Sequence, residues 1–197
     1  MILAAPLALA ALLAATAPGV AGSLMAQDTA ALEFFGFRAG APLSELEALA
    51  RSHRGRLRCA RSRTDPRVSE CHGTVGSAAL SGAARLWISA IDSVAAVITL
   101  SAPVDSARLD RWRTTIERRY GRVTPRVQGS QQMLQWVRRR RMLRLTWRDE
   151  KQGVTASVSL VDGRVLDRWG LVPRPGATTD RDQRSRIRKL PSESSRK

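Results

Sequence analysis

The stretch of residues 131–160 constrains the fold of this chain most, because apolar and polar side chains alternate along it in three successive runs. The apolar members are Leu134, Trp136, Leu143, Leu145, Trp147, Val154, Ala156, Val158 and Leu160. Successive side chains of a β-strand point to opposite faces, so this period of two predicts an antiparallel meander with one buried face. Arg138–Arg141 cover its first turn, and Gln152-Gly153 lies in its second.

A single α+β domain is predicted for residues 27–172, with an antiparallel sheet of about seven or eight strands and two helices packed on one face. Further strands are predicted at residues 32–38, 56–61, 68–74, 85–91, 94–100 and 164–169. The strands 85–91 and 94–100 are apolar on both faces, which predicts central strands covered on both sides. The predicted helices are 42–52 and 103–120. The small residues of 73–83 predict a loop.

Two cysteines, Cys59 and Cys71, are equally distant from Asp65 in the turn of a predicted hairpin. A hairpin symmetric about Asp65 places them opposite each other on one face, within reach of a disulfide bond. A metal site that also uses His53 and His72 is the alternative, but His72 directly follows Cys71 and therefore points to the other face. We predict the disulfide, and neither a metal nor another cofactor.

Residues 1–26 carry no charged side chain and consist mainly of Ala, Leu and Pro. They predict a secretory signal peptide, cleaved near Val20-Ala21-Gly22 or after Ala26, and hence a periplasmic or secreted protein. An uncleaved N-terminal anchor is the alternative, because the apolar run approaches the length that spans a bilayer. No Cys stands at the cleavage region, which argues against a bacterial lipoprotein.

Positive charge dominates the composition, with a formal net charge of +16 at pH 7. Such charge suggests a polyanion as partner, but nearly all of it is Arg, and a GC-rich genome produces the same excess of Arg over Lys. Base-stacking aromatics are scarce, so a specific nucleic-acid partner is not expected. Residues 173–197 contain eight basic and three acidic residues, and they predict a disordered basic tail.

The segment Phe37-Arg38-Ala39-Gly40-Ala41-Pro42-Leu43-Ser44-Glu45-Leu46 predicts a strand, a Gly-containing turn and the start of a helix. With the hairpin that follows, it resembles small bacterial envelope modules of the SmpA/OmlA and β-lactamase-inhibitor-protein kind. Residues 109–121, ending in Tyr120-Gly121, look like a second, looser copy, so the domain is expected to contain two loosely repeated β-α-β-β units. The resemblance implies an envelope binding or scaffold role and no catalytic residues.

No G-x-S-x-G, H-E-x-x-H or P-loop pattern occurs in the sequence, and we predict no enzyme. The first hypothesis is a non-catalytic exported protein that binds a protein partner in the cell envelope through an exposed strand edge or sheet face. The alternative is a binder of anionic lipid, polysaccharide or nucleic acid through the basic hairpin and the tail. Its candidate ligand-binding residues are Arg138, Arg139, Arg140, Arg141, Arg144 and Arg148. Arg138 and Arg140 are expected to project to one side of the strand end, and Arg139 and Arg141 to the other.

Overall fold

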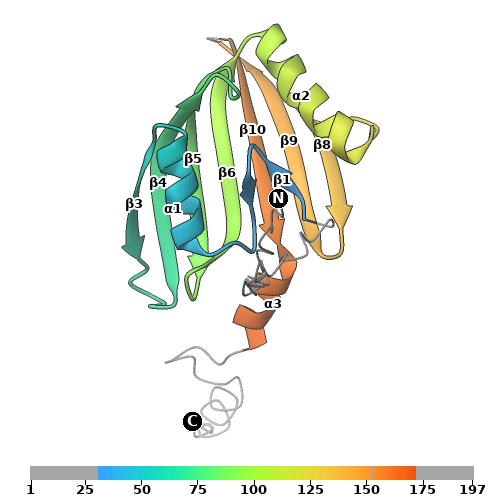
Figure 1. Cartoon of the computed structure of the whole chain (residues 1–197). Coiled ribbons are helices and arrows are strands. Elements are labelled where there is room, and N and C mark those ends of the chain that lie inside the picture. Colours follow the sequence, from blue (N-terminus) through green and yellow to red (C-terminus); the bar gives the residue numbers. More distant parts are fainter. Residues whose placement is uncertain (1–30, 152, 172–197) are drawn as a thin grey trace, which may run out of the picture.

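Figure 1 shows a computed structural model of the protein, which describes residues 31–151 and 153–171. Within these ranges the chain has the predicted α+β fold, with an eight-stranded antiparallel sheet and three helices. The predicted signal peptide, residues 1–26, and the predicted tail, residues 173–197, lie outside the described residues.

The large sheet has the strand order β3-β4-β5-β6-β10-β9-β8-β7, and all its neighbours are antiparallel. Its strands are β3 (Arg56–Arg61), β4 (Val68–Ser77), β5 (Gly82–Ile91), β6 (Val94–Val104), β7 (Arg126–Gln128), β8 (Gln131–Arg138), β9 (Arg141–Glu150) and β10 (Gly153–Asp162). The helices are α1 (Leu43–Ser52), α2 (Ser106–Tyr120) and α3 (Gly163–Leu171).

Two halves of the chain build the two halves of this sheet in the same way. Helix α1 is followed by the four strands β3 to β6, and α2 is followed by the four strands β7 to β10. The last strands of the halves, β6 and β10, pair along the middle of the sheet from Val104↔Val154 to Val97↔Val161. The repeating unit is therefore a helix followed by four strands, and not the expected β-α-β-β unit.

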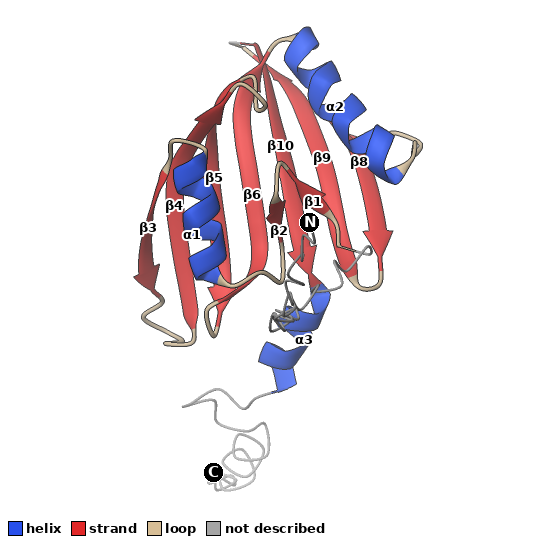
Figure 2. Ribbon diagram, viewed as in Figure 1, coloured by secondary structure: helices blue, strands red, loops and turns tan. Residues whose placement is uncertain are grey.

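Both α1 and α2 lie on the same face of the sheet, one over each half (Figure 2). Leu46 and Ala50 of α1 and Trp112 and Ile116 of α2 are buried against the apolar face of the strands. Burying a large side chain of this kind contributes about 1.5–3 kcal/mol, so this contact layer is the main source of stability. The Asp105 carboxylate starts α2 by accepting a hydrogen bond from the backbone N–H of Arg108 at 2.6 Å.

The alternation read from residues 131–160 is confirmed by the register and burial of β8, β9 and β10. Leu134, Leu145 and Val158 stand in one row across the three strands, and all are buried. Trp136 is 4% exposed and its indole N–H donates to the Gly121 carbonyl at 2.7 Å, whereas the ring of Trp147, also expected in the core, is only partly buried.

The segment 32–38 was predicted as one strand but is a small hairpin of β1 (Glu33–Phe34) and β2 (Phe37–Arg38). Phe35 and Gly36 have φ values of 48° and 83°, which fold the chain back on itself and are the backbone conformation of tight hairpin turns. The sequence signal was Gly36, because Gly adopts positive φ without steric cost.

Two predicted element boundaries were wrong. The loop predicted at residues 73–83 is only the turn of residues 78–81, because β4 continues to Ser77 and β5 starts at Gly82. Position 73 requires glycine, because a Cβ there would lie 2.5 Å from the Arg56 carbonyl oxygen on β3. Pro103 belongs to β6 instead of helix α2, and β6 tolerates it because the pairing with β5 reaches only to Ser101.

The predicted last strand at 164–169 is also wrong, because these residues lie in helix α3. The Asp162 carboxylate accepts a hydrogen bond from the backbone N–H of Arg164 at 2.9 Å, which caps a helix where a hairpin turn was expected. Val165 and Trp169, four residues apart, share one side of the helix and pack on the sheet.

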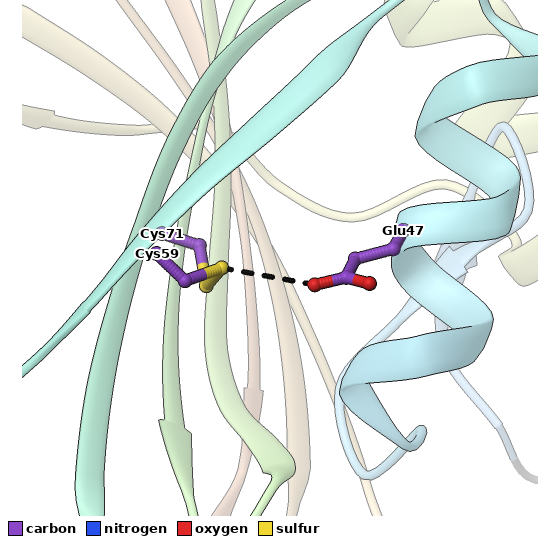
Figure 3. Close-up of a disulfide and its surroundings, with 3 residues drawn as sticks. All are labelled: Glu47, Cys59 and Cys71. Carbon is purple, nitrogen blue, oxygen red and sulfur yellow. Dashed lines mark hydrogen bonds between the residues drawn. A yellow bond between two sulfur atoms is a disulfide. The ribbon is translucent and has the colours of Figure 1, made fainter.

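The predicted disulfide between Cys59 and Cys71 is present (Figure 3). The two residues are direct partners in the register of β3 and β4, with Cα atoms 4.0 Å apart. The bond lies on the face toward α1, where Glu47 approaches the Cys59 sulfur at 3.9 Å. It ties the edge strand β3 to the rest of the sheet.

We expect Trp136→Ala to lower the free energy of unfolding by about 3–5 kcal/mol, because the substitution leaves a cavity in the core. The adjacent Val137 is 62% exposed, so Val137→Ala should cost less than about 0.5 kcal/mol. Urea denaturation of both variants measures the difference. Equal losses would mean that the register of β8 is displaced by one residue.

Replacing both Cys59 and Cys71 with Ala should lower the free energy of unfolding by about 2–4 kcal/mol, because the bond restricts the unfolded chain. Adding a reductant to the wild-type protein should produce the same loss and two thiols that react with a labelling reagent. Two free thiols in the native, unreduced protein would contradict the disulfide.

Candidate functional site

The sheet has a second face that α1 and α2 do not cover, which we call the open face. Strand alternation and register place on it the residues that lie next to the buried ones. Among them are Arg56, Arg58, Glu70, His72, Thr74, Arg85, Trp87, Thr99, Ser101, Arg126, Met133, Gln135, Val137, Met142, Arg144, Thr146, Arg148, Glu150, Thr155, Ser157 and Ser159.

Helix α3 covers one end of this side of the sheet. Val165 is buried there against Ile91 and Ala96. The indole N–H of Trp169 donates to the Asp65 carboxylate at 2.8 Å, which ties the helix to the turn between β3 and β4. Strands β5 and β6 were predicted to be covered on both faces. On the open face they are covered only at this end, by α3, and no other described hydrophobic cluster lies over that face.

The centre of the open face consists of four short hydroxyl side chains, Thr99, Ser101, Ser157 and Ser159, which we call the hydroxyl floor. Thr99 is the register partner of Ser159 across β6 and β10, and Ser101 is the partner of Ser157. The Thr99 and Ser159 hydroxyl oxygens are 3.3 Å apart and hydrogen-bonded. All four side chains are partly exposed, so the floor offers donors and acceptors to a bound molecule.

Longer side chains stand on both sides of the hydroxyl floor. Arg85 and Trp87 on β5 are the partners of Ser101 and Thr99. A surface depression of about 480 Å³ lies on this side, lined by His72, Gly73, Thr74, Arg85, Leu86, Trp87, Thr99 and Ser101. Its aromatic wall, polar floor and guanidinium suit the capture of a side chain or a small polar group.

Trp87 differs from the tryptophans that serve the fold. The indole N–H groups of Trp112, Trp136 and Trp169 donate to Leu80, Gly121 and Asp65, respectively. Trp87 and Trp147 make no hydrogen bond to a described residue through their indoles. Trp147 is partly buried on the helix-covered face, whereas Trp87 is partly exposed on the open face. An aromatic ring with an unused donor on a polar surface is the usual anchor of a protein interface.

The open face is positively charged, because it holds six arginines and only two glutamates. Arg148 already forms an ion pair with Glu150 at 2.7 Å. The hydrogen bonds from Arg148 and then Thr155 lower the pKa of Glu150, so this carboxyl stays ionised. The arginines without a carboxylate oxygen of a described residue within 4.0 Å are Arg56, Arg58, Arg85, Arg126 and Arg144.

The arginines predicted to bind a ligand do not form one patch. Arg139 and Arg140 form a two-residue turn with φ values of 44° and 65°, so Arg138 and Arg141 stand opposite each other on the helix-covered face. The predicted alternation of sides was wrong because the two turn residues belong to neither strand. Of the six candidates, only Arg144 and Arg148 lie on the open face.

Three of the hairpin arginines have partners within the described part of the chain. Arg138 donates to the Tyr120 carbonyl at 2.9 Å, and its guanidinium lies 5.4 Å from the centre of the Tyr120 ring. Arg140 pairs with Asp167 of α3. Arg141 pairs with the fully buried Asp162 at 3.0 Å. These contacts hold β8, β9, α2 and α3 together, so these arginines serve the fold.

Asp162 is the centre of this structural cluster. Burial raises the pKa of its carboxyl, but hydrogen bonds from Arg164 and Arg141 outweigh burial and lower the pKa to about 2. The same carboxylate caps α3, so it links β10, β9 and the helix.

Neither histidine belongs to a cluster of metal ligands. His53 Nε2 lies 3.2 Å from the Phe35 carbonyl oxygen, and its ring stacks on Phe37. His72 is exposed on the open face, where it is the register partner of Trp87. Among residues 31–151 and 153–171, no three His, Cys, Asp or Glu side chains could hold one metal ion.

Sequence reasoning placed Ser157 and Ser159 on the polar face of the meander but missed Arg85, Trp87, Thr99 and Ser101. Their signal was present, because Arg85, Trp87, Thr99 and Ser101 occupy alternate positions in the two strands that were interpreted as apolar on both faces. The run Arg138–Arg141 was the stronger pattern in the sequence and was therefore predicted as the site. Its internal partners could not be recognised, because they are distant along the chain.

Comparisons of the chain with protein-family models, with curated proteins and with solved structures give no match. The disulfide is typical of proteins in an oxidising compartment. None of the helices in the described ranges is long and apolar enough to cross a membrane.

Acid should weaken the protein partly through Asp162. Because its pKa in the folded state, about 2, lies below the ordinary value of 3.8, the carboxylate stabilises the fold at pH 4 and above, and this contribution of about 2 kcal/mol is lost as the pH falls toward 2. Asp162→Asn should be less stable at pH 7 and should lose less stability between pH 4 and pH 2. Urea denaturation at several pH values measures this, and parallel pH curves for the two proteins would contradict it.

Proposed function

We propose that this chain is a non-catalytic, exported binding protein that docks a partner protein on the open face. The observation that carries the proposal is the combination of the partly exposed Trp87 with unpaired arginines around the hydroxyl floor. Trp and Arg dominate the binding energy of protein interfaces, most of all near their centre. The signal peptide predicted from the sequence and the disulfide support a role outside the cytoplasm.

The size of the open face supports a protein as partner. The eight strands are 3 to 11 residues long. At a spacing of about 4.8 Å and a rise of about 3.3 Å per residue, they give an area near 1,000 Å². A stable interface needs about 800 Å² from each protein, so the face is sufficient even with one end covered by α3. The depression beside Trp87 would hold one side chain of that partner, and the surrounding area would bury the rest of the contact.

The alternative of polyanion binding through the hairpin has less support. Arg138, Arg140 and Arg141 already contact Tyr120, Asp167 and Asp162. A polyanion would have to compete with these internal contacts. Its binding would also weaken steeply with salt, which separates the two functions in an experiment.

Site-specific photo-crosslinking tests the proposal. A benzophenone amino acid at His72, exposed on the open face, should crosslink one defined partner in cell-envelope extract of the native host, at both low and high salt. The same amino acid at Arg111, exposed on α2, is the matched control and should not crosslink that partner.

In the same assay, Trp87→Ala should lower the yield at position 72 by about tenfold or more. Identical products from positions 72 and 111, or a yield insensitive to Trp87→Ala, would contradict docking on the open face. Loss of all products at moderate salt would favour the polyanion alternative.

A further inference from the structure

The two halves of the sheet place an arginine at the same position relative to the hydroxyl floor. Arg85 on β5 is the register partner of Ser101, and Arg144 on β9 is the register partner of Ser159. Because Ser101 pairs with Ser157 and Thr99 pairs with Ser159, the two arginines stand at diagonal corners of the floor. They are related by the approximate twofold axis that relates the two helix-plus-four-strand halves.

The other two corners break this symmetry. Trp87 stands beside Thr99, and Thr146 stands beside Ser157. The floor therefore has one arginine on each flank but an aromatic ring on only one of them. A bound element would contact cations on both sides and an apolar surface on the β5 side.

The spacing of the two arginines matches the geometry of an α-helix. Strands β5 and β9 are three strand spacings apart, about 14 Å, and a helix is about 10–12 Å wide. Along the strand direction the arginines are offset by two residues, about 7 Å. On a right-handed helix that lies along β6 and β10, residues i and i+6 lie on opposite flanks, in the same diagonal sense as Arg85 and Arg144. They are about 9 Å apart along the axis, a difference of about 2 Å that long Arg and Glu side chains can span.

Both guanidinium groups are available for a carboxylate. Arg85 is exposed and has no carboxylate oxygen of a described residue within 4.0 Å, although its charge contributes to lowering the pKa of Glu150. Arg144 is oriented by the Gln135 side-chain oxygen, which accepts hydrogen bonds from its Nε–H and Nη2–H groups at 3.1 and 2.9 Å, and by Met142 Sδ, 3.5 Å from Nη2. Neither partner compensates its positive charge. A planar guanidinium held this way binds a carboxylate with two parallel hydrogen bonds.

We infer that the occupant of the open face is an acidic helix of the partner, lying along β6 and β10 with one carboxylate on Arg85 and another on Arg144. This inference rests on the proposed function and adds the chemistry of the partner to it. The two glutamates of the open face should repel such a ligand only weakly. Glu150 accepts hydrogen bonds from Arg148 and Thr155, and Glu70 lies on β4, beyond β5.

Two helical peptides of about 16 residues test the inference, one with two Glu residues six positions apart and the other with Gln at both positions. Titration into the isotope-labelled protein should shift the NMR signals of the Trp87 indole N–H and the Arg144 guanidinium. The Glu peptide should bind about tenfold more tightly than the Gln peptide. R85Q and R144Q should each remove part of this preference, and the double variant should remove all of it.

Arg111→Gln, on the exposed surface of α2, should leave both affinities unchanged. Equal affinity of the two peptides, or no shift at Trp87 and Arg144, would overturn the acidic helix, whereas docking on the open face would still be decided by the crosslinks from position 72. Tighter binding of a sulfated oligosaccharide than of the Glu peptide, lost in the same double variant, would also overturn it.

Discussion

The antiparallel pairing of β6 with β10 is the interaction on which the rest of the structure depends. It joins the last strand of one half of the chain to the last strand of the other and makes one eight-stranded sheet from two four-stranded ones. Because successive side chains alternate, the same pairing supplies both surfaces. Ile98, Leu100, Val158 and Leu160 form the core beneath α1 and α2, and Thr99, Ser101, Ser157 and Ser159 form the hydroxyl floor.

The arginines have different roles because they lie on different faces of the sheet. Arg141 pairs with the buried Asp162 on the helix-covered face and so stabilises the fold, although the residue before it belongs to a surface turn. Gly40 completes that cluster: its φ is +89°, and a Cβ there would lie 2.5 Å from Asp162 Oδ2. The N-terminal hairpin therefore approaches the same carboxylate that caps α3. Arg85 and Arg144, in contrast, face away from every such contact.

The strands and their register were predictable where alternation was unbroken. Leu134, Leu145 and Val158 align as expected because a shift of one residue would expose the whole apolar set. The pairing of Cys59 with Cys71 was equally predictable, because it needed only the symmetry of a hairpin.

Contacts between distant segments could not be predicted from the sequence in the same way. The partners of Arg138, Arg141 and Arg140 lie 18, 21 and 27 residues away, so the charge run looked free when only its neighbours were considered. Helix α3 was missed for a similar reason, since its apolar side packs on Ile91 and Ala96, far back in the chain. The polar face of β8 to β10 was predicted from alternation, but its continuation over β5 and β6 was missed because those strands were interpreted as apolar on both faces.

Hydroxyl-radical footprinting tests most directly whether the open face is an interface. Trp87, Met133 and Met142 report on that face, and the partly buried Trp147 reports on the opposite one. If the protein docks its partner as proposed, oxidation of the three open-face residues should be several-fold lower in the intact envelope than in the purified protein, with Trp147 unchanged. Equal oxidation of Trp87, Met133 and Met142 in both preparations would contradict the account.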